Sequence, residues 1–353
     1  MTFLGVDLHK REFTVCYRHS ENNQVIREFE NSPEGRDEFL TTVSCRDTVA
    51  VESLGFDRFF VKLIAPKVKK VVSVHPGANR IVSESSKKTD KNDAAGLAWG
   101  LEKGVLPKSR FRSEISHQLS RLLTCRASLI GMRTKITNQL NFIVATNGLD
   151  VPLGKLKYRL WRDRVPVETF EFGDYQAWLA FDAQLEKIGE SVNQLDREII
   201  SNSKHFAGYK VLEGIPGFGK VTIAELLAYI DGIENFTSSK SLCAYFGIVP
   251  RIRQSAGQNI LPKKYSRFKA GAITRQGRSS ARCAIVMSVN RVVPENQSLR
   301  DFYERIKGRK GYRKARTATA RKLLTFVYFA LKKGEAISDF GKVDFSKPHE
   351  LPN

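Results

Sequence analysis

Apolar and polar residues alternate along three short segments at the start of the chain, residues 2–8, 12–18 and 24–30, and polar turns separate them. Alternation with a period of two is typical of β-strands that bury one face. The next part of the sequence switches between helical and strand patterns. It predicts, in order, a helix at 34–43, a strand at 48–52, a helix near 57–65, a strand at 70–75 and a helix from about 90.

This order of elements predicts how the N-terminal part folds. Three meandering strands followed by strand–helix crossovers build a mixed sheet with helices on its faces. The order βββαβαβα is that of the RNase H-like fold. We therefore predict an α/β RNase H-like N-terminal domain.

A helical period replaces this pattern in the middle of the chain. From about 113 to 146 the apolar residues form one stripe, made of Leu119, Leu122, Leu129, Ile136, Leu140 and Ile143. A second run has alternating spacings of four and three, the spacing of a heptad seam, at Phe181, Leu185, Ile188, Val192, Leu195 and Ile199. The two runs predict a central helical arm, which is either a hairpin within one chain or a coiled coil that joins subunits.

The length of 353 residues exceeds what one hydrophobic core usually serves, so we expect more than one domain. The patterns predict an RNase H-like domain at 1–108, a helical or coiled-coil linker region at 109–205, a mainly α-helical basic C-terminal domain at 206–335 and a tail at 336–353.

Positive charge is the unusual feature of the composition, with a formal net charge of +21. The segment from Arg251 to Lys333 contains 22 Lys or Arg residues and three acids, which accounts for +19 of that total. Repulsion among so many positive charges destabilises the segment unless an anion binds to it. A solvated basic face is the ordinary alternative, but the imbalance favours a nucleic-acid partner.

A membrane is the competing anionic partner, and the sequence argues against it. The longest apolar run near the C-terminus, Leu323 to Leu331, is about half of the roughly 20 residues that a spanning helix needs. The first ten residues lack the apolar stretch of a signal peptide.

The five cysteines are scattered without CxxC spacing, which favours buried, reduced thiols over disulfides or zinc. We expect a cytoplasmic protein.

Four acidic residues stand where strands end and a helix begins. Asp7 lies near the end of the first strand, Glu52 ends the fourth, and Asp90 and Asp93 open the helix that follows. Each alone is best explained as a surface carboxylate or a helix cap. Together, on neighbouring strands and one helical face, they can form an oxygen-rich site for Mg²⁺ or Mn²⁺, the ions used in phosphodiester chemistry.

A Gly-rich turn precedes an apolar helical run at 221–230. The segment from Leu212 to Lys220 reads LEGIPGFGK and resembles a helix-hairpin-helix DNA module. In such a turn the backbone N–H groups around Gly217 and Gly219 meet a phosphate, and Lys220 adds charge. An ordinary turn between two helices is the alternative.

Ser255 lies in a loop bounded by Pro and Gly, with Arg251 and Arg253 just before it. A serine beside a glycine is usually a turn residue, so the loop by itself does not indicate catalysis.

These motifs together resemble one family, the DEDD transposases of bacterial insertion sequences, which includes Piv-type pilin-gene invertases and recombinases guided by a bridge RNA. The matching segments are, in order, GVDLHK at 5–10, VESLGF at 51–56, KTDKNDA at 88–94, the loop through Ser255, and GAITRQG at 271–277 with Arg282 beyond it. His9 and Ala256 depart from the family's usual residues, and Ala256 restricts the backbone of the serine loop.

The resemblance implies that Asp7, Glu52, Asp90 and Asp93 hold Mg²⁺ or Mn²⁺ and that Ser255 is a nucleophile that joins covalently to a DNA end. It also implies donor and target DNA, a noncoding guide RNA and a homo-oligomer, a dimer that assembles into a tetramer with composite sites. The residues expected to contact nucleic acid are Gly217, Gly219, Lys220, Arg251, Arg253, Lys263, Lys264, Arg278, Arg282, Arg309 and Lys310.

Two other functions remain open at this point. A Holliday-junction-resolving nuclease would use the same carboxylates with water and leave Ser255 structural. A nucleic-acid-binding protein without catalysis would be favoured if the four acids did not converge.

Overall fold

The computed structural model describes residues 2–52, 55, 57–74, 89–251, 272–275, 277 and 279–336. The chain forms two compact units, Met1–Phe111 (unit 1) and Arg112–Asn353 (unit 2). All named strands belong to unit 1, and the described elements of unit 2 are helices.

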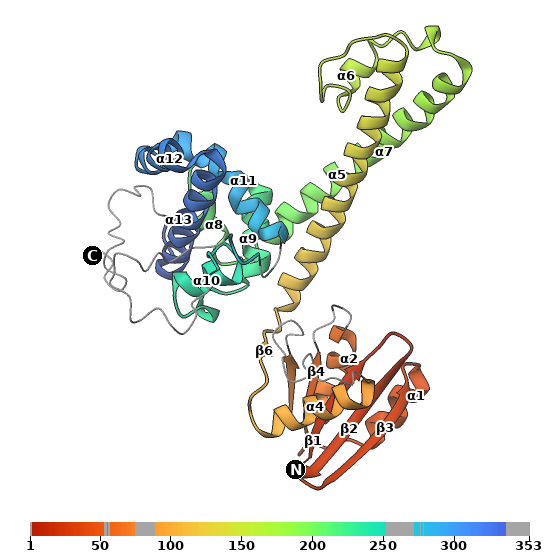
Figure 1. Cartoon of the computed structure of the whole chain (residues 1–353), viewed down its shortest axis with the longest axis vertical. Coiled ribbons are helices and arrows are strands. Elements are labelled where there is room, and N and C mark those ends of the chain that lie inside the picture. Colours follow the sequence, from red (N-terminus) through yellow and green to blue (C-terminus); the bar gives the residue numbers. More distant parts are fainter. Residues whose placement is uncertain are drawn as a thin grey trace, which may run out of the picture. The chain divides into compact units, whose positions relative to one another are not determined.

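Unit 1 is built on a six-stranded mixed sheet with the strand order β3-β2-β1-β4-β5-β6 (Figure 1). Antiparallel pairing joins the first three strands, and β1, β4 and β5 run parallel. The strands are β1 Phe3–Leu8, β2 Glu12–Ser20, β3 Asn23–Glu30, β4 Thr48–Glu52, β5 Lys70–Val74 and β6 Lys108–Ser109. The predicted mixed sheet is confirmed. The two-residue strand β6, antiparallel to β5, was not expected from the sequence.

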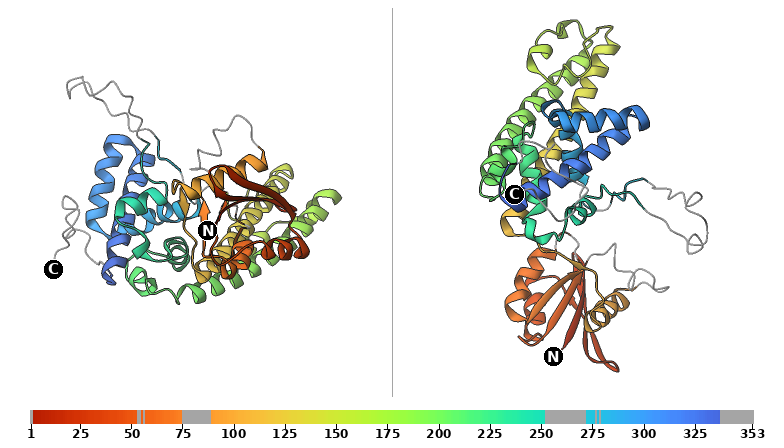
Figure 2. Two further views of the ribbon diagram at one scale, coloured as in Figure 1. Left: turned by 90° about the horizontal axis from the view of Figure 1, so that it is seen from below. Right: turned by 90° about the vertical axis from the view of Figure 1, so that its left-hand side faces the viewer.

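Helices cover both faces of this sheet, as Figures 1 and 2 show. Helices α1 (Pro33–Thr41) and α2 (Asp57–Ile64) bury Phe39 and Phe60 against Phe13 of β2 on one face. A 3-10 turn, Ala65–Lys67, follows α2. Helix α4 (Asp90–Glu102) covers the other face, where Leu97 packs with residues of β4 and β5. Helices therefore lie on both faces of the mixed sheet, as the sequence predicts.

Unit 2 begins with two long helices, α5 (Glu114–Thr146) and α7 (Phe172–Ser203), which run side by side. Leu140 and Ile143 of α5 pack with Trp178 and Leu185 of α7 at one end. The short helix α6 (Arg159–Arg162) and a 3-10 turn, Val167–Thr169, lie between them in the sequence. The two helices thus pack on each other within the chain, as the hairpin alternative predicts, and a coiled coil that joins subunits stays a prediction.

The other described elements of unit 2 are helices around a large apolar core. Its helices are α8 Tyr209–Glu213, α9 Lys220–Ile230, a 3-10 turn at Ile233–Asn235, α10 Ser239–Tyr245, α11 Ser279–Glu295, α12 Gln297–Lys310 and α13 Tyr312–Lys333. The apolar run that ends at Leu331 lies in α13, where Leu323, Leu324 and Val327 are fully buried. This run is therefore part of a globular core. No described helix combines the length and apolar content that crossing a membrane requires.

The cysteines differ in part from expectation. All five are free thiols, and Cys16 and Cys243 are buried. Cys45, Cys125 and Cys283 are exposed, so the expectation that all five are buried is wrong. Cys125 and Cys283 lie on solvent-facing positions of amphipathic helices, where a small side chain is tolerated.

Candidate functional site

Strand β1 places Asp7 on the side of the sheet that faces α4. Side chains alternate along a strand, and Leu4, Val6 and Leu8 pack into the core under α1 and α2. Gly5 and Asp7 therefore point the other way. Asp7 is only 7% exposed, and carboxylates are rarely buried to this degree unless they are paired.

The register between β1 and β4 puts Glu52 beside Asp7. These strands are parallel, and Val6 lies opposite Val51, so Asp7 and Glu52 are the next residues along the two strands. Neighbours in register project to the same face of a sheet. Ala50, two residues before Glu52, packs with Leu97 of α4, which identifies that shared face as the one under α4.

Helix α4 lies very close to β1 because residue 5 has no side chain. A Cβ atom on Gly5 would lie 2.1 Å from the Ala94 carbonyl oxygen and 2.4 Å from the Ala98 backbone nitrogen. The close approach brings the first turn of α4 to the end of β1 that carries Asp7. Thr89 caps this turn, accepting a hydrogen bond of 3.3 Å from the Asn92 N–H.

The first turn of α4 supplies two more carboxylates. Asp93 is 8% exposed, whereas the Asp90 side chain is 52% exposed. The ligand atoms of Asp7, Asp90 and His9 all lie within 4.8 Å of one another. His9 Nε2 lies 3.3 Å from Asp7 Oδ2 and 3.5 Å from Asp90 Oδ1. Side chains from β1, the following turn and α4 thus meet at one end of the sheet.

Burial raises the pKa of Asp7, and the carboxylates of Asp90 and Asp93 raise it further, while the neighbouring imidazole of His9 lowers it. Repulsion among several carboxylates costs free energy that a bound cation would recover. This charge distribution and the oxygen-rich donor set fit a divalent cation such as Mg²⁺ or Mn²⁺.

His9 is a member of this group that the sequence did not assign to the site. In the sequence it stands out only as a departure from the family's usual residue. Its position two residues after Asp7, in the turn that leaves β1, was the available signal, because such a turn lies at the same end of the sheet.

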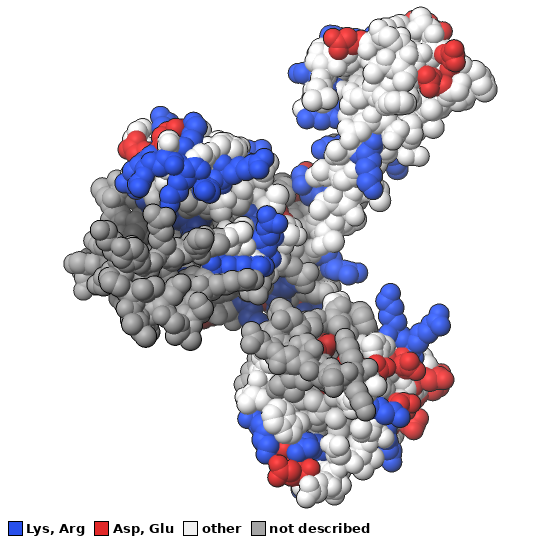
Figure 3. All heavy atoms as spheres, in the orientation of Figure 1, with Lys and Arg blue, Asp and Glu red and all other residues white. Residues whose placement is uncertain are grey.

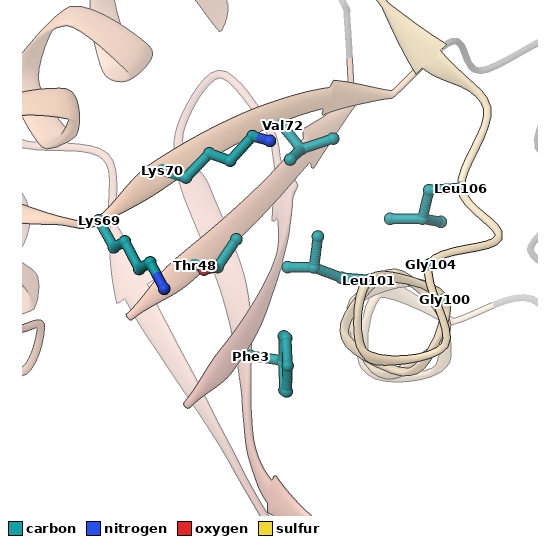
Figure 4. Close-up of a pocket in the computed structure, with 9 residues that line it drawn as sticks. All are labelled: Phe3, Thr48, Lys69, Lys70, Val72, Gly100, Leu101, Gly104 and Leu106. Atoms are coloured by element: carbon teal, nitrogen blue, oxygen red, sulfur yellow. The ribbon is translucent and has the colours of Figure 1, made fainter. Parts of the chain in front are cut away.

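A pocket of about 330 Å³ in unit 1 lies away from these carboxylates (Figure 4). Its lining includes Phe3 and Thr48, which begin β1 and β4, whereas Asp7 and Glu52 lie at the other ends of these strands. The pocket is therefore separate from the carboxylates.

In unit 2 the Gly-rich turn between α8 and α9 packs closely on α11. Gly217 has φ +86°, and a Cβ atom there would lie 2.6 Å from the Arg291 carbonyl oxygen. Gly219 precedes the first residue of α9, Lys220, which is exposed. An arginine nitrogen, Arg291 Nη1, lies 3.0 Å from the position of a Cβ atom on Gly219. The predicted Gly-rich turn before a helix is confirmed, and Arg291 is a cation beside it that the sequence did not single out.

Ser255 lies outside the described residues, but the two segments that flank its loop are described. Pro250 and Ile273 form an antiparallel bridge. The Arg251 N–H donates to the Ala272 carbonyl over 3.0 Å, and the Thr274 N–H donates to the Val249 carbonyl over 2.8 Å. The described residues that precede and follow the Ser255 segment in the sequence are therefore hydrogen-bonded to each other.

The predicted nucleic-acid contacts of the basic segment are only partly described. Arg251 is exposed and donates from Nη2 to the Thr274 carbonyl over 3.1 Å. Arg282 donates to the Phe246 carbonyl over 3.4 Å, which is a structural contact. Arg309 and Lys310 are exposed in the last turn of α12. Outside the described residues lie Arg253, Lys263, Lys264 and Arg278.

Lys and Arg side chains gather over α12 and the neighbouring helices in the space-filling view (Figure 3). Three of these basic residues, Lys307, Arg309 and Lys310, lie in the last turn of α12. Lys307 pairs with Glu304 over 3.1 Å, so part of its charge is compensated within the helix. The remaining face is suited to phosphate groups.

Two transposase families match separate parts of the chain. Residues 4–145 match the family DEDD_Tnp_IS110, described as a transposase. Residues 209–304 match Transposase_20, described as the transposase IS116/IS110/IS902 family. The first match contains all four predicted carboxylates, and the second contains the Gly-rich turn and Ser255.

Individual relatives agree with these matches. The chain is 24% identical to the transposase for insertion sequence element IS1328 of Yersinia enterocolitica over 74% of this chain and 77% of that protein. It is 26% identical to the pilin gene-inverting protein of Moraxella bovis over 94% of this chain and 96% of that protein. Identity reaches 30% with the pilin gene-inverting protein of Moraxella lacunata, over 43% of this chain and 47% of that protein.

Proposed function

This chain belongs to the IS110/IS116 family of insertion-sequence transposases, and on that premise we propose that it cuts and rejoins DNA with a metal-dependent carboxylate site and a serine nucleophile. It is accordingly an enzyme of DNA recombination. The convergence of Asp7, Asp90 and His9 at the end of β1, with Asp93 in the same first turn of α4, carries the proposal.

We assign the metal ligands to Asp7, Glu52, Asp90 and Asp93. A divalent cation held there, Mg²⁺ or Mn²⁺, supplies positive charge to a scissile phosphate. Asp7 and Glu52 are fixed by the sheet, and Asp90 and Asp93 by a capped helix, so their positions are largely set before substrate binds. The strand order of unit 1 supports an RNase H-like catalytic domain at 1–108.

Ser255 is proposed as the nucleophile. Its Oγ attacks the scissile phosphorus, a P–Oγ bond forms as the bond to the deoxyribose oxygen breaks, and the hydroxyl proton ends on the departing oxygen. The bond energy is kept for rejoining. The hydrogen-bonded bridge between Pro250 and Ile273 supports this role, because these two residues flank the serine motif in the sequence and are held together.

The basic part of unit 2 is proposed to bind the nucleic acid, within a helical and basic domain at 206–335 that follows the linker region 109–205. Donor and target DNA, a noncoding guide RNA and assembly from dimer to tetramer complete the proposal. Because the carboxylates and Ser255 lie in different units, one complete site can combine two protomers.

A Holliday-junction-resolving nuclease is the second candidate. The carboxylate geometry of unit 1 serves it equally well, because water can replace the serine hydroxyl as the nucleophile. It differs in forming no covalent bond between protein and DNA.

The metal site is tested by strand cleavage of DNA that carries the ends of the element. Asp93→Asn should abolish Mg²⁺-dependent cleavage while leaving DNA binding and the fold, read by circular dichroism, unchanged. Asp37→Asn, at an exposed acid on α1, is the matched control and should cleave like the parent. Undiminished cleavage by the Asp93 variant would refute the metal site.

A further inference from the structure

The turn that carries His9 is held in place by Asn31, which follows β3. The His9 N–H donates to the Glu12 carbonyl over 3.0 Å, closing the turn between β1 and β2. Asn31 Nδ2 donates to the His9 carbonyl over 2.9 Å. Arg36 in turn donates from Nη1 to Asn31 Oδ1 over 2.9 Å. The backbone of His9 is therefore fixed on both sides.

From this fixed backbone the imidazole reaches back over the end of β1. Nε2 lies 3.3 Å from Asp7 Oδ2 and 3.5 Å from Asp90 Oδ1. Adjacent ligand atoms around an octahedral cation with bonds of about 2.1 Å lie about 3 Å apart. The nitrogen is thus close to the spacing of a ligand that shares one cation with both carboxylates.

We propose that His9 is a nitrogen ligand of the cation at this site, with Asp7 and Asp90, and that it favours Mn²⁺ over Mg²⁺. The inference rests on the proposed metal-dependent function of the carboxylates. Oxygen donors alone suit Mg²⁺, whereas imidazole nitrogen binds transition metals more strongly. One imidazole among carboxylates should therefore shift the preference of the site without excluding Mg²⁺.

An imidazole that merely pairs with two carboxylates is the competing explanation for the same distances. In that case the imidazole would move away from the carboxylates when a cation binds, because the cation would occupy the position between them. The two explanations differ in whether nitrogen stays bonded to the metal.

Mn²⁺ bound to the full chain distinguishes them, because pulsed electron paramagnetic resonance detects ¹⁴N bonded to Mn²⁺. We expect a nitrogen coupling in the parent that His9→Asn removes. The same variant should weaken Mn²⁺ binding, measured by titration calorimetry, by at least about tenfold, with a smaller effect on Mg²⁺. His19→Asn, at an exposed histidine of β2, should change neither quantity.

Failure of the ligand role and failure of the metal site are separable. If Asp7→Asn and Asp93→Asn abolish Mn²⁺ binding but the parent shows no nitrogen coupling, or His9→Asn leaves both the coupling and the affinity ratio unchanged, the ligand role is wrong. If Mn²⁺ binding survives both aspartate replacements, the carboxylate site and the ligand role are wrong together.

Discussion

Gly5 lets α4 lie directly on β1, and the position of Asp93 depends on that contact. Gly5→Ala would push a methyl group to 2.1 Å from the Ala94 carbonyl oxygen, so α4 must shift. Overpacking of this kind costs about 1–3 kcal/mol. We expect a lower urea midpoint and weakened metal binding.

The matched control for this change is Gly131→Ala in α5. Nothing lies within 4 Å of a Cβ atom there, and alanine favours a helix over glycine by about 1 kcal/mol. This variant should be neutral or more stable. Equal stability of the two variants would contradict the account of how α4 approaches β1.

Glu225 of α9, which is half-buried, provides a test of what it costs to desolvate a carboxylate. Burial raises its pKa, and Ser280 and Arg126 offset this only in part. The folded state disfavours the ionised form of this carboxyl. The protein is therefore most stable below the pKa that Glu225 has in the unfolded chain, and it loses stability as the pH rises from there through the pKa of Glu225 in the folded state. Glu225→Gln should therefore raise the melting temperature at pH near 7 and have little effect below about pH 4.

Thermal unfolding across pH measures this difference. Glu198→Gln, at an exposed position of α7, serves as the control and should leave the pH profile unchanged. If Glu225→Gln raised the melting temperature by the same amount at every pH, desolvation of the ionised carboxylate would not be the cause.

The acidic residues of the site could be located from the sequence, because Asp7 and Glu52 stand at the ends of recognisable apolar strands. The role of His9 could not. The backbone of His9 is held by a hydrogen bond from Asn31, which comes two strands later in the chain, and the apolar pattern does not reveal such a contact.

At the scale of elements, the sequence pattern predicted the bounds of those strands and helices that depend on neighbouring residues in the chain. Strand β4 spans the residues expected, and α4 and α5 begin within a residue of their predicted starts. Strand β6 and the bridge between Pro250 and Ile273 were missed because each depends on a partner distant in sequence.

The end of the α5–α7 pair that holds α6 depends on a buried cation. Arg162 is 4% exposed and pairs with Asp182 and Glu186 of α7. Arg162→Ala should destabilise this region by less than the roughly 3–5 kcal/mol of a fully buried pair, because both carboxylates remain partly exposed. Faster proteolysis near α6 would report it.

Arg159→Ala is the matched control on the same short helix. Its side chain is 71% exposed, and an ion pair made by so exposed a side chain contributes about 1 kcal/mol or less to the stability of the fold. If both variants were digested at the same rate, the buried pairing of Arg162 would not be what holds this region.

At the scale of the whole molecule, the charge is concentrated in one segment and should dominate nucleic-acid affinity. Replacing Arg309 and Lys310 by Glu should weaken binding and flatten its salt dependence, by about 0.9 in slope for each phosphate that the variant no longer neutralises. Binding isotherms at several salt concentrations measure this slope.

Replacing Lys135 and Lys187 by Glu changes the net charge equally outside the basic segment and is the control. It should leave the slope close to that of the parent. If both double variants changed the slope alike, general charge rather than a phosphate-binding face would explain the affinity.

We propose that this chain joins itself to DNA through Ser255 under the control of the unit 1 carboxylates. The direct measurement uses DNA labelled at the cut end and denatured after reaction with Mg²⁺. We predict a covalent protein–DNA adduct with the parent chain and none with Ser255→Ala or Asp7→Asn, although both variants still bind DNA. Cleavage at the parental rate by Ser255→Ala, without an adduct, would contradict the account and identify a nuclease that uses water.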